Sequence, residues 1–213
     1  MVRLTENNDW VVWVLLGVIV VFIVVLQYLQ REAGLREFFT QNFIDSGNIF
    51  PTYLLISGCY MLLLTTLLSK YIPILPQWVE AFSVSGYSLN KFGFTFLAVL
   101  AFYLVKFFFS FVFYSSIGQD TKWGKFYFVS SKFYLALSFI LMAVVFTSYY
   151  LPVDQLFFLR ALIISSLAVF VFKILFFYFN KNRVLPKEWY YKILYICTLQ
   201  FAPLLALGKL LFY

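Results

Sequence analysis

The chain of 213 residues contains no histidine, and only 12% of its residues are charged. The lack of histidine excludes His-based acid–base catalysis, haem or His-zinc ligation, and Ser-His or Cys-His nucleophiles. The two cysteines, Cys59 and Cys197, lie far apart without a CxxC motif, which indicates packing residues rather than a disulfide framework. No glycine-rich phosphate-binding motif is present. These absences predict a protein that is not an enzyme and that uses no cofactor and no metal.

Carboxylates are also scarce, and all nine acidic residues lie in the tails or between the long apolar segments. An intramembrane aspartyl protease needs two embedded Asp, and an ion-coupled transporter usually needs at least one buried acid. Neither requirement is met. Asp120, Asp154 and Glu188 stand near segment ends, and nothing around them matches a catalytic pattern.

Apolar residues dominate the sequence, at 63% hydrophobic and 23% aromatic. A bilayer core takes about 20 apolar residues per helix, and helices satisfy their own backbone groups in lipid. We therefore expect an all-α integral membrane protein, a single polytopic domain over residues 1–213 with a bundle of about six transmembrane helices and short interfacial helices. The first segment is too long for a signal peptide and is expected to be retained. The expected spans are 10–29, 52–68, 92–114, 133–151, 157–179 and 189–212.

The distribution of Lys and Arg predicts the orientation. Nine of them lie in the connections after the first, third and fifth spans, and five lie on the other side. By the positive-inside rule, both termini are expected outside the cytoplasm. The net charge of +7 does not indicate nucleic acid, because membrane edges already account for most of these residues.

Three connections are long enough to have structure of their own. Residues 31–51 alternate Phe and charge with a helical period, which predicts a short interfacial helix that ends near the Ser-Gly-Asn turn at 46–48. Residues 71–92 are apolar and contain two prolines, which suggests an interfacial or re-entrant segment. Residues 115–132 predict a basic-aromatic loop against anionic lipid. A plain surface connector is the alternative for each.

Two lysines, Lys106 and Lys173, lie inside predicted spans, in the similar contexts LAFYLVKFFFSF and LAVFVFKILFFYF. Lys173 lies about 7–8 Å beyond the centre of its span by helical rise, so its ammonium can snorkel to the headgroups. Lys106 lies about 4–5 Å past its own centre, which leaves its stem short for snorkelling and favours a nearby acceptor. The candidate acceptors are Gln200, Thr198, Ser57, a carbonyl freed near Pro203, a lipid phosphate and a carboxylate of another protein.

The last span contains the polar residues Thr198 and Gln200 just before Pro203. Pro203 removes a backbone hydrogen bond and favours a kink or break in the helix. The two preceding polar residues are placed to satisfy or use the carbonyls freed there. Proline kinks are common in membrane helices, so the kink by itself needs no function.

The string LYICTLQFAPLL in the last span, the opening NNDW, Lys106 and the six-span layout resemble an uncharacterised family of Bacteroidota inner-membrane proteins. This family has a C-terminal LYxCTLxxxPL signature and is a domain of unknown function over essentially the whole chain. It often has Glu where this chain has Gln200, which can only form hydrogen bonds, so an obligatory intramembrane salt bridge is not expected. The resemblance implies a multi-pass protein of the bacterial inner (cytoplasmic) membrane, and hence periplasmic termini, but no activity.

The sequence leaves two functions open. The preferred one is a non-catalytic subunit or scaffold of a larger cell-envelope complex, binding other integral membrane proteins through span six and the Lys106 face. By analogy with the lineage, protein export, type 9 secretion or gliding is conceivable. The alternative is a small transporter or lipid-handling protein with an anion site around Lys106, Lys173, Thr198 and Gln200, using the helix broken at Pro203. Membrane lipids are expected partners in both cases.

Overall fold

The chain folds into a bundle of long helices in the computed structural model, which describes residues 8–30, 34–44, 46–72, 83–84, 87–88, 90–118, 120–152, 154–179 and 188–212. The described elements are α1 (Asp9–Val24), the π-helical η1 (Val25–Leu29), α2 (Leu35–Thr40), α3 (Ile49–Tyr71), β1 (Ser83–Val84), β2 (Tyr87–Ser88), α5 (Lys91–Ser116), α6 (Asp120–Tyr150), α7 (Gln155–Phe179), α8 (Trp189–Leu194), the π-helical η2 (Tyr195–Phe201) and α9 (Ala202–Phe212).

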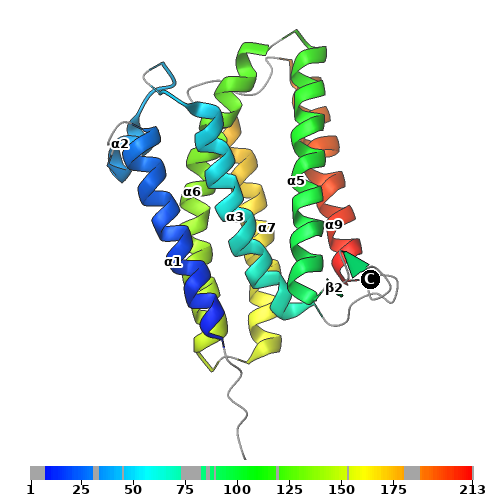
Figure 1. Ribbon diagram of the computed structural model, residues 1–213. Coiled ribbons are helices and arrows are strands. Elements are labelled where there is room, and N and C mark those ends of the chain that lie inside the picture. The colour runs from blue at the N-terminus through cyan, green and yellow to red at the C-terminus, as the bar shows by residue number, and fades with distance from the viewer. Residues whose placement is uncertain are drawn as a thin grey trace, which may run out of the picture.

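The long helices run side by side along one bundle axis (Figure 1). The most extensive contact joins α3 and α6, with α1 against α3 and α9 against α5. α1 begins and α9 ends at the same end of the bundle (Figure 1).

Among the described residues, five helices are long and apolar enough to cross a membrane by length and composition, which fits a membrane protein. The sixth expected span, 189–212, is not among them. It is helical from α8 to α9, but the π-helical η2 divides it just before Pro203, where the sequence predicts a kink or break. A π-helical stretch is a recognised cause of helix bending. The five candidate spans are Asp9–Leu29, Ile49–Tyr71, Lys91–Ser116, Lys122–Tyr150 and Leu156–Phe177.

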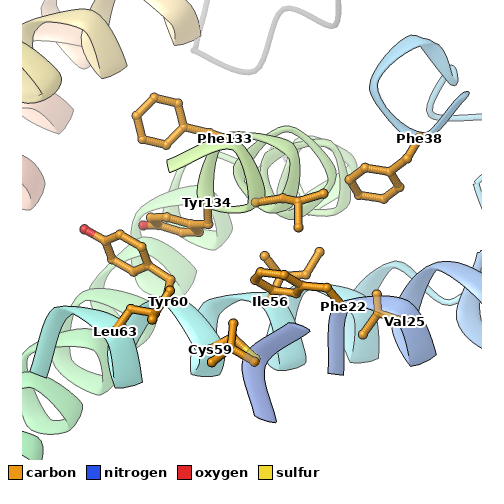
Figure 2. Packing of buried hydrophobic residues seen from close by; sticks show 11 residues of the cluster. Phe22, Val25, Phe38, Ile56, Cys59, Tyr60, Leu63, Phe133 and Tyr134 are labelled. Atoms are coloured by element: carbon orange, nitrogen blue, oxygen red, sulfur yellow. The ribbon is translucent and has the colours of Figure 1, made fainter. Parts of the chain in front are cut away.

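The core lies where α1, α2 and α3 meet α6. Phe22 of α1, Phe38 of α2 and Ile56 of α3 are buried in one cluster with Tyr134 of α6 (Figure 2). Along α6 every residue from 126 to 135 is buried, so this stretch contacts neighbours on all its sides.

The prediction of a loop over residues 115–132 is wrong for most of this range, because α6 already begins at Asp120. The turn before it is short and includes Gly118 at φ 67°, in the left-handed region that glycine adopts readily after a helix end. The polar string Ser130–Ser131–Lys132 reads as surface in the sequence, yet the packed neighbours bury it inside α6.

The predictions for the other two connections, 31–51 and 71–92, can be compared with the structure to different extents. The helix expected within 31–51 is present as α2, which ends at Thr40, before the expected turn. Its Phe38 is buried, whereas Leu35 and Phe39 are exposed. Within 71–92, residues 73–82, 85–86 and 89 lie outside the described residues, and so does the re-entrant prediction. The described part there is the antiparallel pair β1–β2.

Candidate functional site

Lys106 and Lys173, the two lysines predicted inside spans, come together in the bundle. Lys106 lies near the middle of α5 and Lys173 in the second half of α7. Their side-chain nitrogens lie within hydrogen-bonding reach of each other. A buried and a half-buried lysine side chain from separate helices thus meet in the bundle.

Lys173 is held against α6. Its Nζ donates a hydrogen bond to the Tyr134 hydroxyl at 3.1 Å. The same ammonium lies 4.9 Å from the centroid of the Tyr134 ring and 5.7 Å and 5.8 Å from those of Phe133 and Phe177. Aromatic faces attract cations, so these rings stabilise the ammonium without neutralising it.

Lys106 lies inside the bundle rather than along its outer surface. The residue is only 8% exposed, and its Nζ lies 5.9 Å from the Phe102 ring centroid. Snorkelling, which the sequence left open, does not describe a side chain buried in this way. Ser57, one of the proposed acceptors, donates its hydroxyl to the Leu54 carbonyl of its own helix.

Tyrosines extend the lysine pair across two more helices. The Tyr103 hydroxyl on α5 lies within hydrogen-bonding reach of those of Tyr60 on α3 and Tyr134 on α6. The Tyr60 and Tyr134 rings stack at a centroid distance of 5.0 Å, and Figure 2 shows their hydroxyl oxygens at the same end of the stack. Polar groups therefore continue from Lys106 through Lys173, Tyr134 and Tyr103 to Tyr60.

The sequence pattern does not mark these tyrosines as site residues. The available signal is spacing: Tyr103 and Lys106 are one helical turn apart, and Tyr127 and Tyr134 are two turns apart. In a chain with 23% aromatic residues, such spacing does not stand out.

The site can offer positive charge and hydroxyl donors. The sequences of α3, α5 and α7 contain no Asp or Glu, and the only acid within α6 is its first residue, Asp120. Two ammonium groups and a phenol suit an oxyanion, which accepts several charge-assisted hydrogen bonds at once. Within the described ranges, His, Cys, Asp and Glu form no cluster of three or more that could hold a metal ion.

The predicted residues of the last span stand apart from this arrangement in the described contacts. Thr198 is exposed, and its hydroxyl donates to the Leu194 carbonyl at 2.6 Å within the same helical segment. Pro203 is the second residue of α9 and half-buried. The side chain of Gln200 lies outside the described residues, so its predicted role as acceptor stays a prediction.

Two other lysines within the helices have a different environment. The Lys132 Nζ donates to the carbonyls of Phe39 at 3.0 Å and Gln41 at 2.6 Å, at the end of α2. It also lies 4.2 Å from the centroid of the Phe128 ring. The Lys70 Nζ donates to the Ser148 carbonyl in the last turn of α6. These ammonium groups are bound by backbone carbonyls.

Comparison with known proteins gives a family but no function. A family described as "Domain of unknown function (DUF4271)" matches residues 10–211, which is nearly the entire chain. No curated protein and no solved structure matches the chain.

Proposed function

The chain belongs to the DUF4271 family, and we propose that it is an integral membrane protein that binds an anion between its helices, as a small transporter or lipid-handling protein. The observation that carries this proposal is the convergence of buried Lys106 on α5 and half-buried Lys173 on α7 to within hydrogen-bonding reach of each other. Tyr134 adds a hydroxyl to the pair.

The physical argument rests on charge. Burying one ammonium costs free energy, and bringing a second like charge beside it raises that cost. An oxyanion placed between the two groups replaces their repulsion with two attractions, which strengthen as the local dielectric constant falls. The lysine pair, the Tyr134 hydroxyl and the surrounding rings would then bind the ligand and exclude bulk water.

The proposed location is the bacterial inner membrane, with both termini in the periplasm. The five apolar helices support a membrane location. The excess of Lys and Arg in alternate connections supports the orientation. The start of α1 and the end of α9 at the same end of the bundle agree with termini on one side (Figure 1).

The complex-subunit hypothesis stays a prediction, with a changed basis. Because the Lys106 side chain is buried by helices of its own chain, a partner helix has no direct access to it. A partner would instead meet the outer face of the last helical segment, where Thr198 is exposed. Export, type 9 secretion and gliding as its context rest on analogy alone.

A thermal-unfolding experiment in detergent tests the anion site. Sodium phosphate or sodium sulfate is compared with sodium chloride at constant ionic strength, with the wild type beside the double variant Lys106→Met/Lys173→Met. A ligand at about 100 times its Kd stabilises the native state by about 2.7 kcal/mol. We therefore expect the oxyanion to raise the wild-type Tm by several degrees more than the Tm of the double variant.

The difference between the two proteins is the decisive quantity, because sulfate and phosphate stabilise most proteins through exclusion from the surface. Lys125→Met, a change at a half-buried lysine near the start of α6, serves as the matched control and should keep the wild-type response. Equal shifts in the wild type and the double variant would overturn the proposed function.

A further inference from the structure

Three buried hydroxyl groups on α5 and α6, the helices that carry Lys106 and Tyr134, have no hydrogen-bond partner among the described residues. They belong to Ser110 on α5 and to Ser130 and Tyr127 on α6. The residues are 3%, 1% and 4% exposed, respectively. A buried hydroxyl without a partner is costly, so a polar group or water is expected to meet it.

Other serines of α6 behave differently. Ser131 donates its hydroxyl to the Phe128 carbonyl at 2.9 Å, and Ser138 donates to the Tyr134 carbonyl at 2.7 Å. Such bonds to the preceding turn are the usual way in which a helical serine satisfies its hydroxyl in an apolar environment. Ser110 and Ser130 make no such bond, although their own helices offer the same carbonyls.

The unpartnered hydroxyls continue the helix faces that carry the site. Ser110 follows Lys106 by four residues, so the two share one face of α5. Ser130 precedes Tyr134 by four residues, and Tyr127 precedes Ser130 by three, so these three share one face of α6.

The two faces lead to the same end of the bundle. α5 and α6 are antiparallel neighbours joined by the turn at Gly118 (Figure 1). Moving from Lys106 to Ser110 along α5, and from Tyr134 through Ser130 to Tyr127 along α6, both lead toward this turn. The Phe107 and Tyr127 rings stack at a centroid distance of 5.8 Å and join the two helices along the way.

We propose that Ser110, Ser130 and Tyr127 line a hydrated path from the α5–α6 turn to the lysine pair, and that the ligand is a small water-borne oxyanion of the phosphate or sulfate type. This inference rests on the proposed function and adds to it the route of entry and the source of the ligand. A lipid headgroup carries the same anionic chemistry, but it enters from the side of a bundle and needs no column of buried hydroxyls. The hydroxyls instead replace water around an ion that sheds its hydration shell.

Cysteine accessibility tests the path in the full-length protein. The background variant Cys59→Ala/Cys197→Ala removes both native thiols. Ser110→Cys and Ser130→Cys are then introduced separately, each a near-isosteric change. Two vesicle preparations, in which the protein is inserted in opposite orientations, are treated with the membrane-impermeant anion 2-sulfonatoethyl methanethiosulfonate. Ser138→Cys is the matched control, because Ser138 is also buried on α6 but lies beyond Tyr134, away from the turn.

Only a thiolate in contact with water reacts, so we expect Ser110→Cys and Ser130→Cys to be modified about tenfold or more faster than Ser138→Cys. The modification should be faster from the side of the α5–α6 turn, and sodium phosphate or sulfate should slow it. If one variant does not fold, the other tests the same path from the facing helix.

Modification of both positions at the rate of Ser138→Cys would overturn the path. The result is separable from the proposed function, because the anion-dependent Tm difference between wild type and Lys106→Met/Lys173→Met is measured independently. A retained Tm difference without modification would locate an anion site that is closed to water at this end. Binding of vesicles rich in phosphatidic acid, lost in the same double variant, would then identify a lipid headgroup as the ligand in place of a free oxyanion.

Discussion

Four of the lysines within the described helices form two pairs with opposite surroundings. Lys132 and Lys70 donate to backbone carbonyls near the ends of other helices. Buried Lys106 and half-buried Lys173 come within hydrogen-bonding reach of each other beside Tyr134. The same residue type therefore has different roles, depending on which groups surround it and accept its hydrogen bonds.

The difference follows from the helix ends. The last carbonyls of a helix have no partner within the helix and carry partial negative charge, so a lysine placed there satisfies them and is itself stabilised. Two lysines that meet inside a bundle add positive charge instead. The first arrangement contributes to folding, whereas the second favours a bound anion. Substitutions by Met, which keeps the length and apolar stem of lysine, should separate the two.

The largest effect is expected from Lys132→Met. The change removes two hydrogen bonds to the carbonyls of Phe39 and Gln41 and leaves both acceptors at the end of α2 without this donor. Hydrogen bonds to a charged group contribute about 1.5–3 kcal/mol each, and we expect a loss of about 3 kcal/mol in stability. The measurement is the thermal midpoint in detergent, which should fall by about 10 °C. Lys125→Met, the control on the same helix, should change the stability by less than about 0.5 kcal/mol.

A Lys132→Met variant with the thermal midpoint of the wild type would contradict the structural role assigned to this lysine. A second readout refines the test: anion-dependent stabilisation should persist in Lys132→Met, because the Lys132 ammonium contacts the end of α2 and not the lysine pair. Loss of both properties together would mean that the two lysine pairs are not separable.

The second-largest effect is expected from Lys106→Met, which, unlike Lys132→Met, should not lower the stability of the fold. Lys106→Met removes one of two like charges and its burial cost, so the stability should stay the same or rise by about 1–2 kcal/mol. Phosphate or sulfate binding should weaken by about 10- to 100-fold, since one charge-assisted contact is lost. Isothermal titration beside thermal unfolding measures both quantities. A variant that is less stable but binds as well as wild type would place Lys106 with Lys132 as a structural lysine.

The sequence predicts the surroundings of the two lysine pairs to different extents. The depth of Lys106 and Lys173 in their spans follows from counting residues. Both lysines lie in odd-numbered spans, the third and the fifth, so the two helices are expected to cross the membrane in the same direction. The contact between the two lysines cannot be predicted in this way, because hydrophobic periodicity fixes neither the rotation nor the neighbours of a helix that is apolar on all sides. Lys132 was harder: Ser-Ser-Lys resembles a loop until the carbonyls at the end of α2 are placed beside it.

The helix boundaries show the same limit. The sequence predicts α3 and α5 well, because turn residues and charges flank their apolar runs. It starts the fourth span at residue 133, whereas α6 begins at Asp120. The first part of α6 contains polar residues that neighbouring helices bury, and burial by neighbours leaves no mark on local composition. The π-helical η2 likewise needed the structure, although Pro203 indicated the position of the irregularity.

A smaller effect is expected at Lys70. Its Nζ donates to the Ser148 carbonyl and lies 4.8 Å from the Tyr149 ring centroid, but the side chain is only partly buried. Solvent competes for an ammonium in this position, so Lys70→Met should cost about 1 kcal/mol. The thermal midpoint should fall by about 3 °C, with anion binding unchanged. A loss as large as that of Lys132→Met would mean that burial does not distinguish the two carbonyl-bound lysines.

The smallest effect tests whether Tyr134 belongs to the ligand site or to the core. Tyr134→Phe keeps the ring that stacks on Tyr60 and removes only the hydroxyl that accepts from Lys173 at 3.1 Å. Because the ring supplies most of the packing, the stability should change by less than about 1 kcal/mol. With its phenol partner lost, Lys173 is held toward α6 by the aromatic rings alone, and we expect about five-fold weaker sulfate binding by titration. Tyr53→Phe is the matched control, because Tyr53 packs on Tyr134 at 6.3 Å but accepts no hydrogen bond from Lys173 among the described contacts. Equal binding in Tyr134→Phe and wild type would confine the ligand to the two ammonium groups, and a large loss of stability would make the phenol a structural counterpart of the helix-end carbonyls that hold Lys132.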